Sequence, residues 1–444
     1  MRGRRQKDRR SAPYGMIDIA EPWRTCCIIV NGDTGMLEEL GMKQAVQVAE
    51  AQEMVLGCVQ PVGVEKVALL EALHRVTAEE VTAQRHIPLD DNSAMDGYAV
   101  RHTDVVGATR DQPVALEVLE ILPAGKRPRH RIAPGTAVKI MTGAPLPEGA
   151  DTVVQVEHTD ESDTRVQIYR APRLGSNLRR RGEDIRLGEC VLAAQTFLRP
   201  AELGVLASVG KAQVLVYQRP RVAILATGDE IIDPGEPDTQ GKIINSNSYT
   251  LAGQSAEAGG NPLLLGVAPD ERVIMSQRIA SGLRADVLIT SGGVSVGSFD
   301  YVRECLDAFG FQARFWTVAV RPGSPATFGM VGHVPVFSLP GNPVASMVTF
   351  ELFVRPALRK MTGRRDLFRP RLDAVLQDTV EKRRGMRTLL RGVLRQDEGQ
   401  TTVTTTGPQG SGILRSMSLA NCLIDLPEDT ERLQPGARVQ VMLL

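Results

Sequence analysis

The stretch ADVLITSGGVSVGSFD, residues 285–300, decides the fold of the central part of this chain. Its first half is a continuous apolar run, which is typical of a strand buried on both faces of a parallel sheet. The SGGVSVG segment that follows, residues 291–297, holds three glycines and two serines. Glycines let the backbone approach a ligand closely, and free amides at a helix start attract anions. We therefore predict a strand, a glycine-rich turn and a helix start that bind an anionic, phosphorylated ligand. A tight turn that only needs glycine is the alternative.

The same alternation continues on both sides of this stretch. Apolar strands that end in polar loops are RVAILATGDE (221–230), PLLLGVAPD (262–270) and PVFSLPGNP (335–343). Segments with helical spacing follow them. Strand–loop–helix alternation with continuous apolar strands predicts a doubly wound parallel sheet with helices on both faces.

The other segments predict further domains, so the fold class is α/β multidomain. Apolar residues recur at helical spacing from Leu37 to Ala83, whereas the segments after Pro88 are short β-branched runs between Gly and Pro turns. The last segments alternate in period two, as in a β-barrel or sandwich. We divide the chain into a disordered extension (1–35), an elongated helical linker domain (36–85 and 181–218), an inserted β domain (86–180), the α/β domain (219–367) and a terminal β domain (368–444).

Composition excludes several classes of protein. Lys plus Arg and Asp plus Glu both number 52, so the net charge is zero, which argues against general nucleic-acid binding. No apolar run reaches the roughly 18 residues of a membrane span, and the N-terminus lacks the apolar stretch of a signal peptide. The six cysteines form no CxxC pair, and the histidines have no metal-ligand spacing. We therefore expect a cytoplasmic protein with no membrane contact.

Polar residues beyond the strand ends are the candidate site residues, because ligands bind outside the carboxyl ends of parallel strands. Glu230, Asp270 and Asp300 all lie there. Three carboxylates beside an anion site would repel the ligand unless a hard cation such as Mg²⁺ bridges them. Taken singly, each acid is more simply a helix cap or a solvated loop residue.

Two Pro-containing turns add further candidates. LPGNP fixes a rigid turn around Asn342, because Pro340 and Pro343 lock the backbone, and turn chemistry alone is the alternative. Arg321 precedes a Pro-Gly turn and is a candidate oxyanion clamp, with a plain surface arginine as the alternative.

Three loops of the inserted β domain also carry polar clusters. DNSAMDGYAV (91–100), KIMTGAPLPEGAD (139–151) and RRRGEDI (179–185) contain acids, a threonine and three arginines. From the residues alone we favour a structural role for these loops, as turns and interdomain salt bridges. No Ser/His/Asp or Cys/His arrangement is present, so nucleophilic catalysis is not supported.

Taken together, these segments resemble the MoeA family, the molybdopterin molybdenumtransferases, which include the gephyrin E domain. The resemblance runs in order from about Leu37 to the C-terminus. Its motifs are DNSAMDGYAV, KIMTGAPLPEGADTVV, RRRGEDIRLGE, ILATGDE, ITSGGVSVGSFDYV, RPGSPATFG, SLPGNPVAS and TTTGPQGSGIL.

The resemblance implies a C-terminal β-barrel and an elongated homodimer, with the active site between the α/β domain of one subunit and the β domain of the other. It replaces the structural reading of the three β-domain loops with a functional one. The catalytic positions it implies are Asp96, Thr142, Asp184, Glu230, Asp270, Asp300, Pro340 and Pro343. The substrate-binding positions are Ser291, Gly292, Gly293, Ser295, Arg321, Ser324, Asn342, Arg391 and Ser411, and Glu230 and Asp300 are the candidate Mg²⁺ ligands.

The reaction implied by the resemblance takes adenylylated molybdopterin and molybdate and releases AMP with the help of Mg²⁺. It also implies a donor protein for the adenylylated molybdopterin, and acceptor molybdoenzymes or their chaperones. Many relatives carry lysines where this chain has Thr317 and Ser324. Fewer cations should weaken oxyanion capture. A paralogue that uses tungstate or another nucleotide-linked pterin, and an inactive scaffold of the same fold, are therefore the alternatives.

Overall fold

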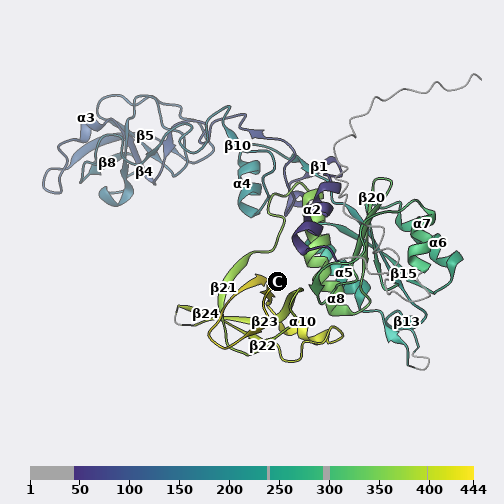
Figure 1. The fold of residues 1–444 in the computed structure, drawn as a ribbon. Coiled ribbons are helices and arrows are strands. Elements are labelled where there is room, and N and C mark those ends of the chain that lie inside the picture. Colours follow the sequence, from purple (N-terminus) through teal and green to yellow (C-terminus); the bar gives the residue numbers. More distant parts are fainter. Residues whose placement is uncertain (1–44, 238–240, 294–300, 398) are drawn as a thin grey trace, which may run out of the picture. The chain divides into compact units, whose positions relative to one another are not determined.

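The computed structural model describes residues 45–237, 241–293, 301–397 and 399–444 (Figure 1). The chain separates into two units, Met1–Gln44 and Ala45–Leu444, and all described residues belong to the second unit. The predicted disordered extension, residues 1–35, lies outside the described residues. None of the described helices is both long and apolar enough to cross a bilayer.

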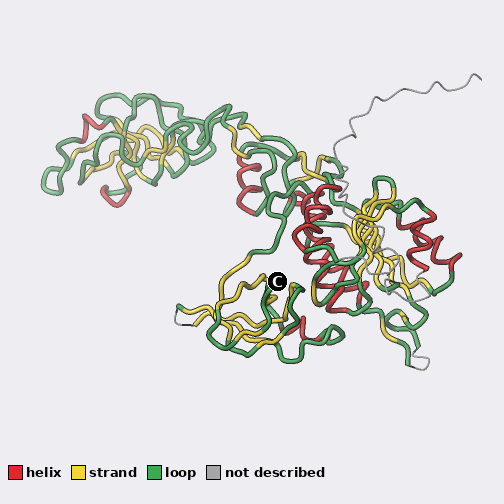
Figure 2. The backbone as a smooth tube through the Cα atoms, viewed as in Figure 1, coloured by secondary structure: helices red, strands yellow, loops and turns green. Residues whose placement is uncertain are grey.

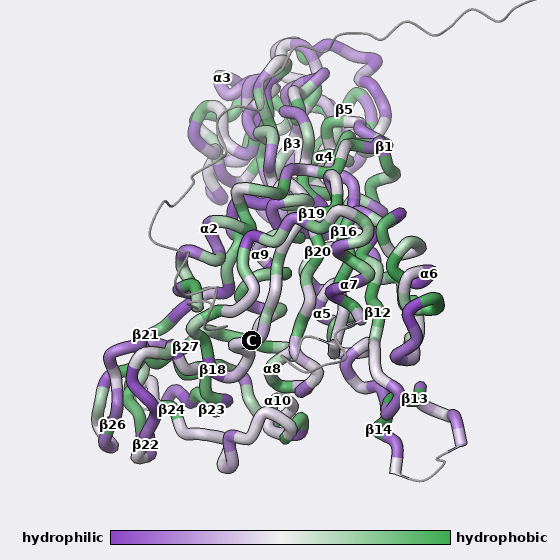
Figure 3. The backbone as a smooth tube through the Cα atoms, turned by 45° about the vertical axis from the view of Figure 1, so that its right-hand side comes forward, coloured by the Kyte–Doolittle hydropathy of each residue, from purple (hydrophilic) through white to green (hydrophobic). Residues whose placement is uncertain are grey.

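The α/β domain is built on a six-stranded sheet in the order β15-β12-β16-β20-β19-β17. The first four strands are parallel, as predicted. They are β15 (Asn261–Ala268), β12 (Arg221–Thr227), β16 (Val287–Ser291) and β20 (Val334–Leu339). The middle of β12, residues 222–226, is hydrophobic (Figure 3) and buried, because it lies inside the sheet with helices on both faces.

Two strands of this sheet were not predicted. β19 (Thr327–Val331) pairs antiparallel with both β20 and β17 (Gln312–Phe315), so the sheet is not parallel throughout. Gly332 has a φ of +59° in the tight turn that joins β19 to β20. A left-handed residue is what a two-residue hairpin needs, and glycine adopts it without strain.

Helices cover both faces of the sheet, as expected (Figure 2). Alternate residues of each strand face opposite layers, so Ile224 and Ile289 belong to one core cluster and Leu225 and Leu288 to the other. The first layer holds α5 (Asn247–Glu257) and a long helix made of α8 (Pro343–Thr349), a π-helical turn (Phe350–Val354) and α9 (Arg355–Met361). The second layer holds α6 (Arg272–Gly282) and α7 (Tyr301–Ala308).

The region predicted to be helical from Leu37 to Ala83 is only partly so. α2 (Val48–Cys58) is a helix, but it shares its core with the first helical layer of the α/β domain, whereas the prediction placed it in the linker domain. The next segment is a strand, β1 (Val64–Ala68), paired with β11 (Gln213–Tyr217). The helical prediction was wrong there because spacing alone does not reveal a distant strand partner. Other linker elements are η1 (Leu70–Ala72), β2 (Val81–Thr82), β10 (Cys190–Leu192) and α4 (Pro200–Ser208).

The inserted β domain contains a five-stranded sheet in the order β7-β4-β6-β5-β8. A two-stranded pair, β3 with β9, lies beside the loops that carry its candidate residues. The elements are β3 (Asn92–Ser93), β4 (Gly97–Val100), α3 (His102–Val105), β5 (Val114–Leu122), β6 (Thr136–Ile140), β7 (Thr152–Gln155), η2 (Val156–His158), β8 (Arg165–Ile168) and β9 (Leu178–Arg179).

The C-terminal domain is a closed barrel, because β23 pairs with both β24 and β25 at the two ends of the order β23-β24-β21-β27-β25. This settles the choice between barrel and sandwich. A short strand from the α/β region, β18 (Val320–Arg321), adds to β23. The other elements are β21 (Arg371–Leu376), β22 (Val380–Glu381), β23 (Arg387–Asp397), β24 (Gln400–Thr405), α10 (Arg415–Leu419), β25 (Cys422–Leu426), β26 (Arg432–Leu433) and β27 (Arg438–Leu443).

Candidate functional site

The parallel strands β12, β16 and β20 end side by side at Thr227, Ser291 and Leu339, which we call the carboxyl edge of the sheet. The Gly292 N–H donates to the Leu339 carbonyl over 3.2 Å, and the Thr227 hydroxyl lies 3.4 Å from the Ser291 carbonyl. These bonds bring the start of the glycine-rich loop beside the LPGNP turn, as the sequence predicted.

Gly292 and Gly293 are required by packing as well as by backbone conformation. Their φ values are +97° and +65°, in the left-handed region that favours glycine. A Cβ on Gly292 would lie 2.7 Å from the Thr227 carbonyl oxygen, and one on Gly293 would lie 2.6 Å from a methyl of Val302. The tight-turn reading therefore accounts for both glycines, and their bare backbone is also what an anion site requires.

The side chain of Asn247 links the two loops, although the sequence did not single it out. Its amide nitrogen donates to the Ser291 hydroxyl and to the Gly341 carbonyl, each over 2.8 Å. Asn247 is the first residue of α5, which follows the loop beyond β12. Its position in NSNS, a polar run at a helix start beyond a sheet edge, is the signal that would have identified it.

Carboxylates gather at the end of β12 and β15. The Asp270 N–H donates to Asp229 over 2.9 Å, and Glu230 lies close to both residues. Burial raises the pKa of Asp270, and the negative charges of Asp229 and Glu230 raise it further. The structure therefore brings together the predicted Glu230 and Asp270, and adds Asp229, which the prediction did not include.

These acids do not form a finished metal cage. Among the described residues, no three Asp, Glu, His or Cys side chains converge closely enough to hold a metal ion. Asp300 and Ser295, two further predicted residues, lie in the segment 294–300 outside the described residues.

The LPGNP turn begins α8. Asn342 precedes the helix and Pro343 is its first residue, where proline suits the start of a helix. The Val344 N–H donates to the Ser411 carbonyl over 3.1 Å, so a second predicted residue meets the turn through its backbone. Pro340 directly follows the last residue of β20.

Arg391 is fully buried and holds the loop that contains Ser411. Its guanidinium donates to the Gly410 carbonyl over 3.1 Å and to the Ser416 hydroxyl over 3.0 Å. Burial lowers the pKa of Arg391, since no carboxylate accompanies it. Arg391 therefore stabilises the conformation of this loop from within the barrel domain and is not exposed to a ligand.

Arg321 and Ser324 occupy a turn that is joined to both the barrel and α8. Arg321 is exposed at the end of β18 and pairs with Thr388 of β23. The Ser324 carbonyl accepts from the Val318 N–H over 2.9 Å. Gly323 between them packs closely against Thr349 of α8, so this turn lies along the helix that starts at the LPGNP turn.

In the inserted domain, Asp96 and Thr142 contact each other directly. The Thr142 backbone N–H and hydroxyl donate to the same Asp96 oxygen, over 2.6 Å and 2.8 Å. The backbone bond, and then the hydroxyl bond, hold the pKa of Asp96 below its ordinary value. Both residues are exposed, so a fixed and ionised carboxylate faces solvent.

Hydrogen bonds to Asp91, which lies on the same loop as Asp96, connect that loop to the loop that carries Asp184. Asp91 accepts from the Arg180 side chain and from the Arg181 backbone, each over 2.7 Å. Asp184 itself is exposed, with its N–H bonded to the Ile87 carbonyl over 3.0 Å. The expectation of an interdomain salt bridge was wrong for this pair, because Arg180 and Asp91 both belong to the inserted domain. The pair leaves Asp184 exposed to solvent.

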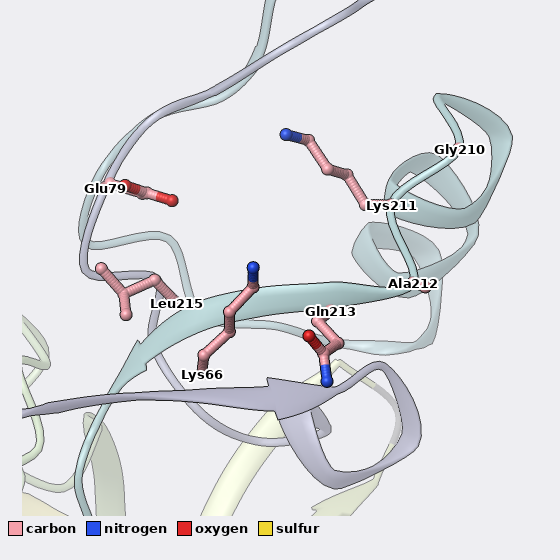
Figure 4. A pocket seen from close by; sticks show the side chains of 7 residues that line it. All are labelled: Lys66, Glu79, Gly210, Lys211, Ala212, Gln213 and Leu215. Atoms are coloured by element: carbon pink, nitrogen blue, oxygen red, sulfur yellow. The ribbon is translucent and has the colours of Figure 1, made fainter.

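A separate hollow of about 510 Å³ lies in the linker domain. Lys66, Glu79 and Lys211 surround it (Figure 4). Glu79 and Lys66 are exposed, and none of the predicted site residues lines this hollow. We therefore do not place the candidate site there.

Three family models match consecutive parts of the chain. They are the MoeA N-terminal region (domain I and II) at residues 46–210, a probable molybdopterin binding domain at 223–360 and the MoeA C-terminal region (domain IV) at 373–444. The chain belongs to the MoeA family. The molybdopterin-binding model covers the sheet and the whole carboxyl edge described above.

Curated relatives of this MoeA-family protein match over most of their length. Molybdopterin molybdenumtransferase 2 of Mycobacterium tuberculosis (strain ATCC 25618 / H37Rv) is 39% identical over 395 residues, which cover 88% of this chain and 96% of the relative. Molybdopterin molybdenumtransferase of Bacillus subtilis (strain 168) is 37% identical and covers 86% and 90%. The crystal structure of the molybdopterin biosynthesis moeA protein from Pyrococcus horikoshii OT3 has a TM-score of 0.76 at 31% identity, covering 90% of this chain and 100% of that one.

Proposed function

We propose that this protein is a molybdopterin molybdenumtransferase that inserts molybdenum from molybdate into adenylylated molybdopterin and releases AMP. The names of its relatives support the transferase activity. The observation that carries the proposal is the carboxyl edge, where the glycine-rich loop, the LPGNP turn and the acids Asp229, Glu230 and Asp270 meet.

The chain's own groups would act by positioning and by electrostatics. The Gly293 backbone N–H, with the Ser291 hydroxyl, would bind the phosphate end of the substrate, while the Gly292 N–H holds the loop against Leu339. Ser295 and Arg321 would hold molybdate, a tetrahedral oxyanion, with Ser324 and Asn342 beside it, and Arg391 would keep Ser411 against the turn. No protein nucleophile is needed, because correct placement and stabilised charge supply the catalytic effect.

The acids at the carboxyl edge fit Mg²⁺. The charges of Asp229 and Glu230 raise the pKa of Asp270, and a bound cation would relieve that repulsion. Mg²⁺ is usually held by one or two carboxylates together with substrate phosphates, so an incomplete cage is what it requires. Glu230 and Asp300 would be its ligands, with Asp270 beside them. When bound, the ion would offset negative charge on the pyrophosphate that is cleaved.

The active site is proposed to be composite, in a homodimer. Asp96, Thr142 and Asp184 of the partner subunit would complete the carboxyl edge, and their exposure in a single chain suits that role. The Asp184 carboxylate has no hydrogen-bond or ion-pair partner among the described residues and is free to meet a ligand. A donor protein for the substrate, and acceptor molybdoenzymes or chaperones for the product, follow from the same proposal.

Two alternative functions are each supported by a specific observation. The family resemblance implies lysines where this chain has Thr317 and Ser324. Their replacement by neutral residues favours a paralogue that uses tungstate or another nucleotide-linked pterin. The shared fold also permits an inactive scaffold. An inactive scaffold would have no need of acids such as Asp96, Glu230 and Asp270, so their presence argues against this alternative.

One assay separates these readings. The purified protein is mixed with adenylylated molybdopterin, Mg²⁺ and either molybdate or tungstate, and AMP release is followed. We expect release with molybdate. Release with tungstate alone would favour the tungstate paralogue. No release with either oxyanion would leave the scaffold or a paralogue that uses another nucleotide-linked pterin.

A further inference from the structure

Two asparagines near the start of α5 have different hydrogen-bonding patterns. Asn245 is buried, and its side chain bonds Asp233 over 2.8 Å and Ser248 through both its nitrogen and its oxygen. Ser248 lies in the first turn of α5, and Asp233 lies in the segment between β12 and α5. Asn245 therefore stabilises the start of the helix. Asn247, two residues later, sends its side chain away from its own helix.

The orientation of the Asn247 amide is fixed by its partners. A backbone carbonyl only accepts hydrogen bonds, so the Asn247 nitrogen must face the Gly341 carbonyl, 2.8 Å away. The same nitrogen faces the Ser291 hydroxyl oxygen, also at 2.8 Å. The Asn247 side-chain oxygen is then buried and has no partner within the described part of the chain. A buried acceptor without a partner lowers stability, so this side chain is not explained by folding alone.

This arrangement decides which way the Ser291 hydroxyl points. Its oxygen accepts the Asn247 hydrogen bond, so its own hydrogen is free to donate elsewhere. Ser291 is 4% exposed and sits at the end of β16, directly before Gly292. A hydroxyl oriented as a donor, beside two glycines whose backbone no side chain covers, suits an anionic ligand.

We propose that Asn247 is a positioning residue that joins the glycine-rich loop to the LPGNP turn and orients the Ser291 hydroxyl as a donor to the anionic end of the substrate. The inference rests on the proposed function, because it assigns a task within that same site. It also makes a structural claim about the two loops that holds whether or not the protein turns over substrate.

Asn247→Asp is the sharpest test, because the two side chains have the same shape. A carboxylate accepts but does not donate, so it would take the Ser291 hydrogen for itself and repel the Gly341 carbonyl. We expect KM for adenylylated molybdopterin to rise more than tenfold in Asn247→Asp, and by less in Asn247→Ala. In both variants kcat should change by less than KM, and the melting temperature should fall by less than it does in Asn245→Ala.

Two other asparagines, Asn245 and Asn261, supply controls. Asn245→Ala should lower the melting temperature more than it raises KM, which is the reverse of Asn247→Ala. Asn261→Ala, at an exposed position of β15, should change neither quantity. Since Asn247 acts partly through Ser291, the double variant Asn247→Ala with Ser291→Ala should raise KM by less than the product of the single effects.

Amide hydrogen exchange tests the positioning separately from the reaction. Loss of the Asn247 link should speed exchange at Gly292, whose N–H bonds the Leu339 carbonyl. If the wild type releases no AMP but exchange still rises in Asn247→Asp, the proposed function fails and the positioning inference stands. If the wild type is active while KM and exchange in Asn247→Asp match the wild type, the inference is wrong. Should Asn247→Asp fail to fold, Ser291→Ala breaks one of the two links by itself, and unchanged KM and exchange there would also overturn it.

Discussion

The acids of the carboxyl edge and the acid of the inserted domain are held in opposite electrostatic conditions. At the carboxyl edge, burial and the neighbouring charges of Asp229 and Glu230 raise the pKa of Asp270. In the inserted domain, two hydrogen bonds from Thr142 lower the pKa of Asp96. The first group is a set of like charges with no ion-pair partner among the described residues, whereas the second is a single charge stabilised by two hydrogen-bond donors.

This difference indicates which kind of ligand each region would bind. A bound cation would stabilise carboxylates that repel each other at the end of a strand. The carboxyl edge therefore suits a metal ion with its phosphate ligand. A carboxylate held by two hydrogen bonds from a threonine is rigid and ionised, so it suits the positioning of a ligand brought from elsewhere. The comparison predicts that the two regions respond differently to the same kind of change.

Removing charge from the carboxyl edge should have the largest effect. The double change Glu230→Gln with Asp270→Asn is expected to reduce AMP release by about a thousandfold, because the cation loses Glu230 as a ligand and the negative charge of Asp270 beside it. The melting temperature should hold or rise, since the repulsion is gone. A steady-state AMP assay over a range of Mg²⁺ concentrations, with thermal melts of the same samples, measures both. A fall in both activity and stability would contradict the idea of uncompensated charge.

Thr142→Val should have a smaller effect, because it removes only one of the two donors to Asp96. The backbone N–H of residue 142 remains, so the pKa of Asp96 should rise toward its ordinary value without reaching it. We expect kcat/KM to fall about tenfold, in the range of one lost hydrogen bond to a charged group. Carbon-detected NMR titration of the Asp96 carboxyl checks the pKa, and Thr142→Ser, which keeps the hydroxyl, is the control that should restore it.

Gly292→Ala tests whether the glycine-rich loop tolerates any side chain. The new Cβ would lie 2.7 Å from the Thr227 carbonyl oxygen at a φ of +97°. We expect a loss of about 1–3 kcal/mol in the free energy of unfolding, from strain and displacement together.

Gly310→Ala is the matched control for this change, because Gly310 also has a left-handed φ, +79°, but has open space around it. Chemical denaturation of both variants compares them. Equal losses would mean that backbone strain alone, and not the close contact with Thr227, governs the loop.

The pH dependence of stability should show the smallest effect, with opposite signs in the two regions. The folded pKa of Asp270 is raised, so its contribution to stability is present at low pH and lost as pH rises above about 4, the ordinary value for Asp. The folded pKa of Asp96 is lowered, so its contribution is present above about pH 4 and lost as pH falls through the lower value.

Thermal melts of wild type, Asp270→Asn and Asp96→Asn across this window measure the two contributions. We expect differences of about one or two degrees, since both groups are partly or fully exposed. Differences of the same sign in the two variants would remove the contrast on which the comparison rests.

Much of this protein followed from its sequence alone. The apolar runs that end at Thr227, Ser291 and Leu339 predicted the parallel strands and their shared edge, because a strand buried on both faces has to be continuously apolar. The acids Glu230 and Asp270 could be placed at that edge from topology, since parallel strands end on the same side. Period-two alternation likewise predicted the terminal β domain.

Contacts between distant segments were decided only by the tertiary structure. Nothing local in the sequence shows that Val64–Ala68 would pair with Gln213–Tyr217, that the Thr142 hydroxyl would meet Asp96, or that Asn247 would reach both Ser291 and Gly341. Periodicity and turn chemistry report on neighbours within a few residues, whereas these contacts join segments from tens to more than a hundred residues apart. The sequence therefore determined which groups stand at the ends of the strands, and the packed chain decided which of them touch and how their pKa values shift.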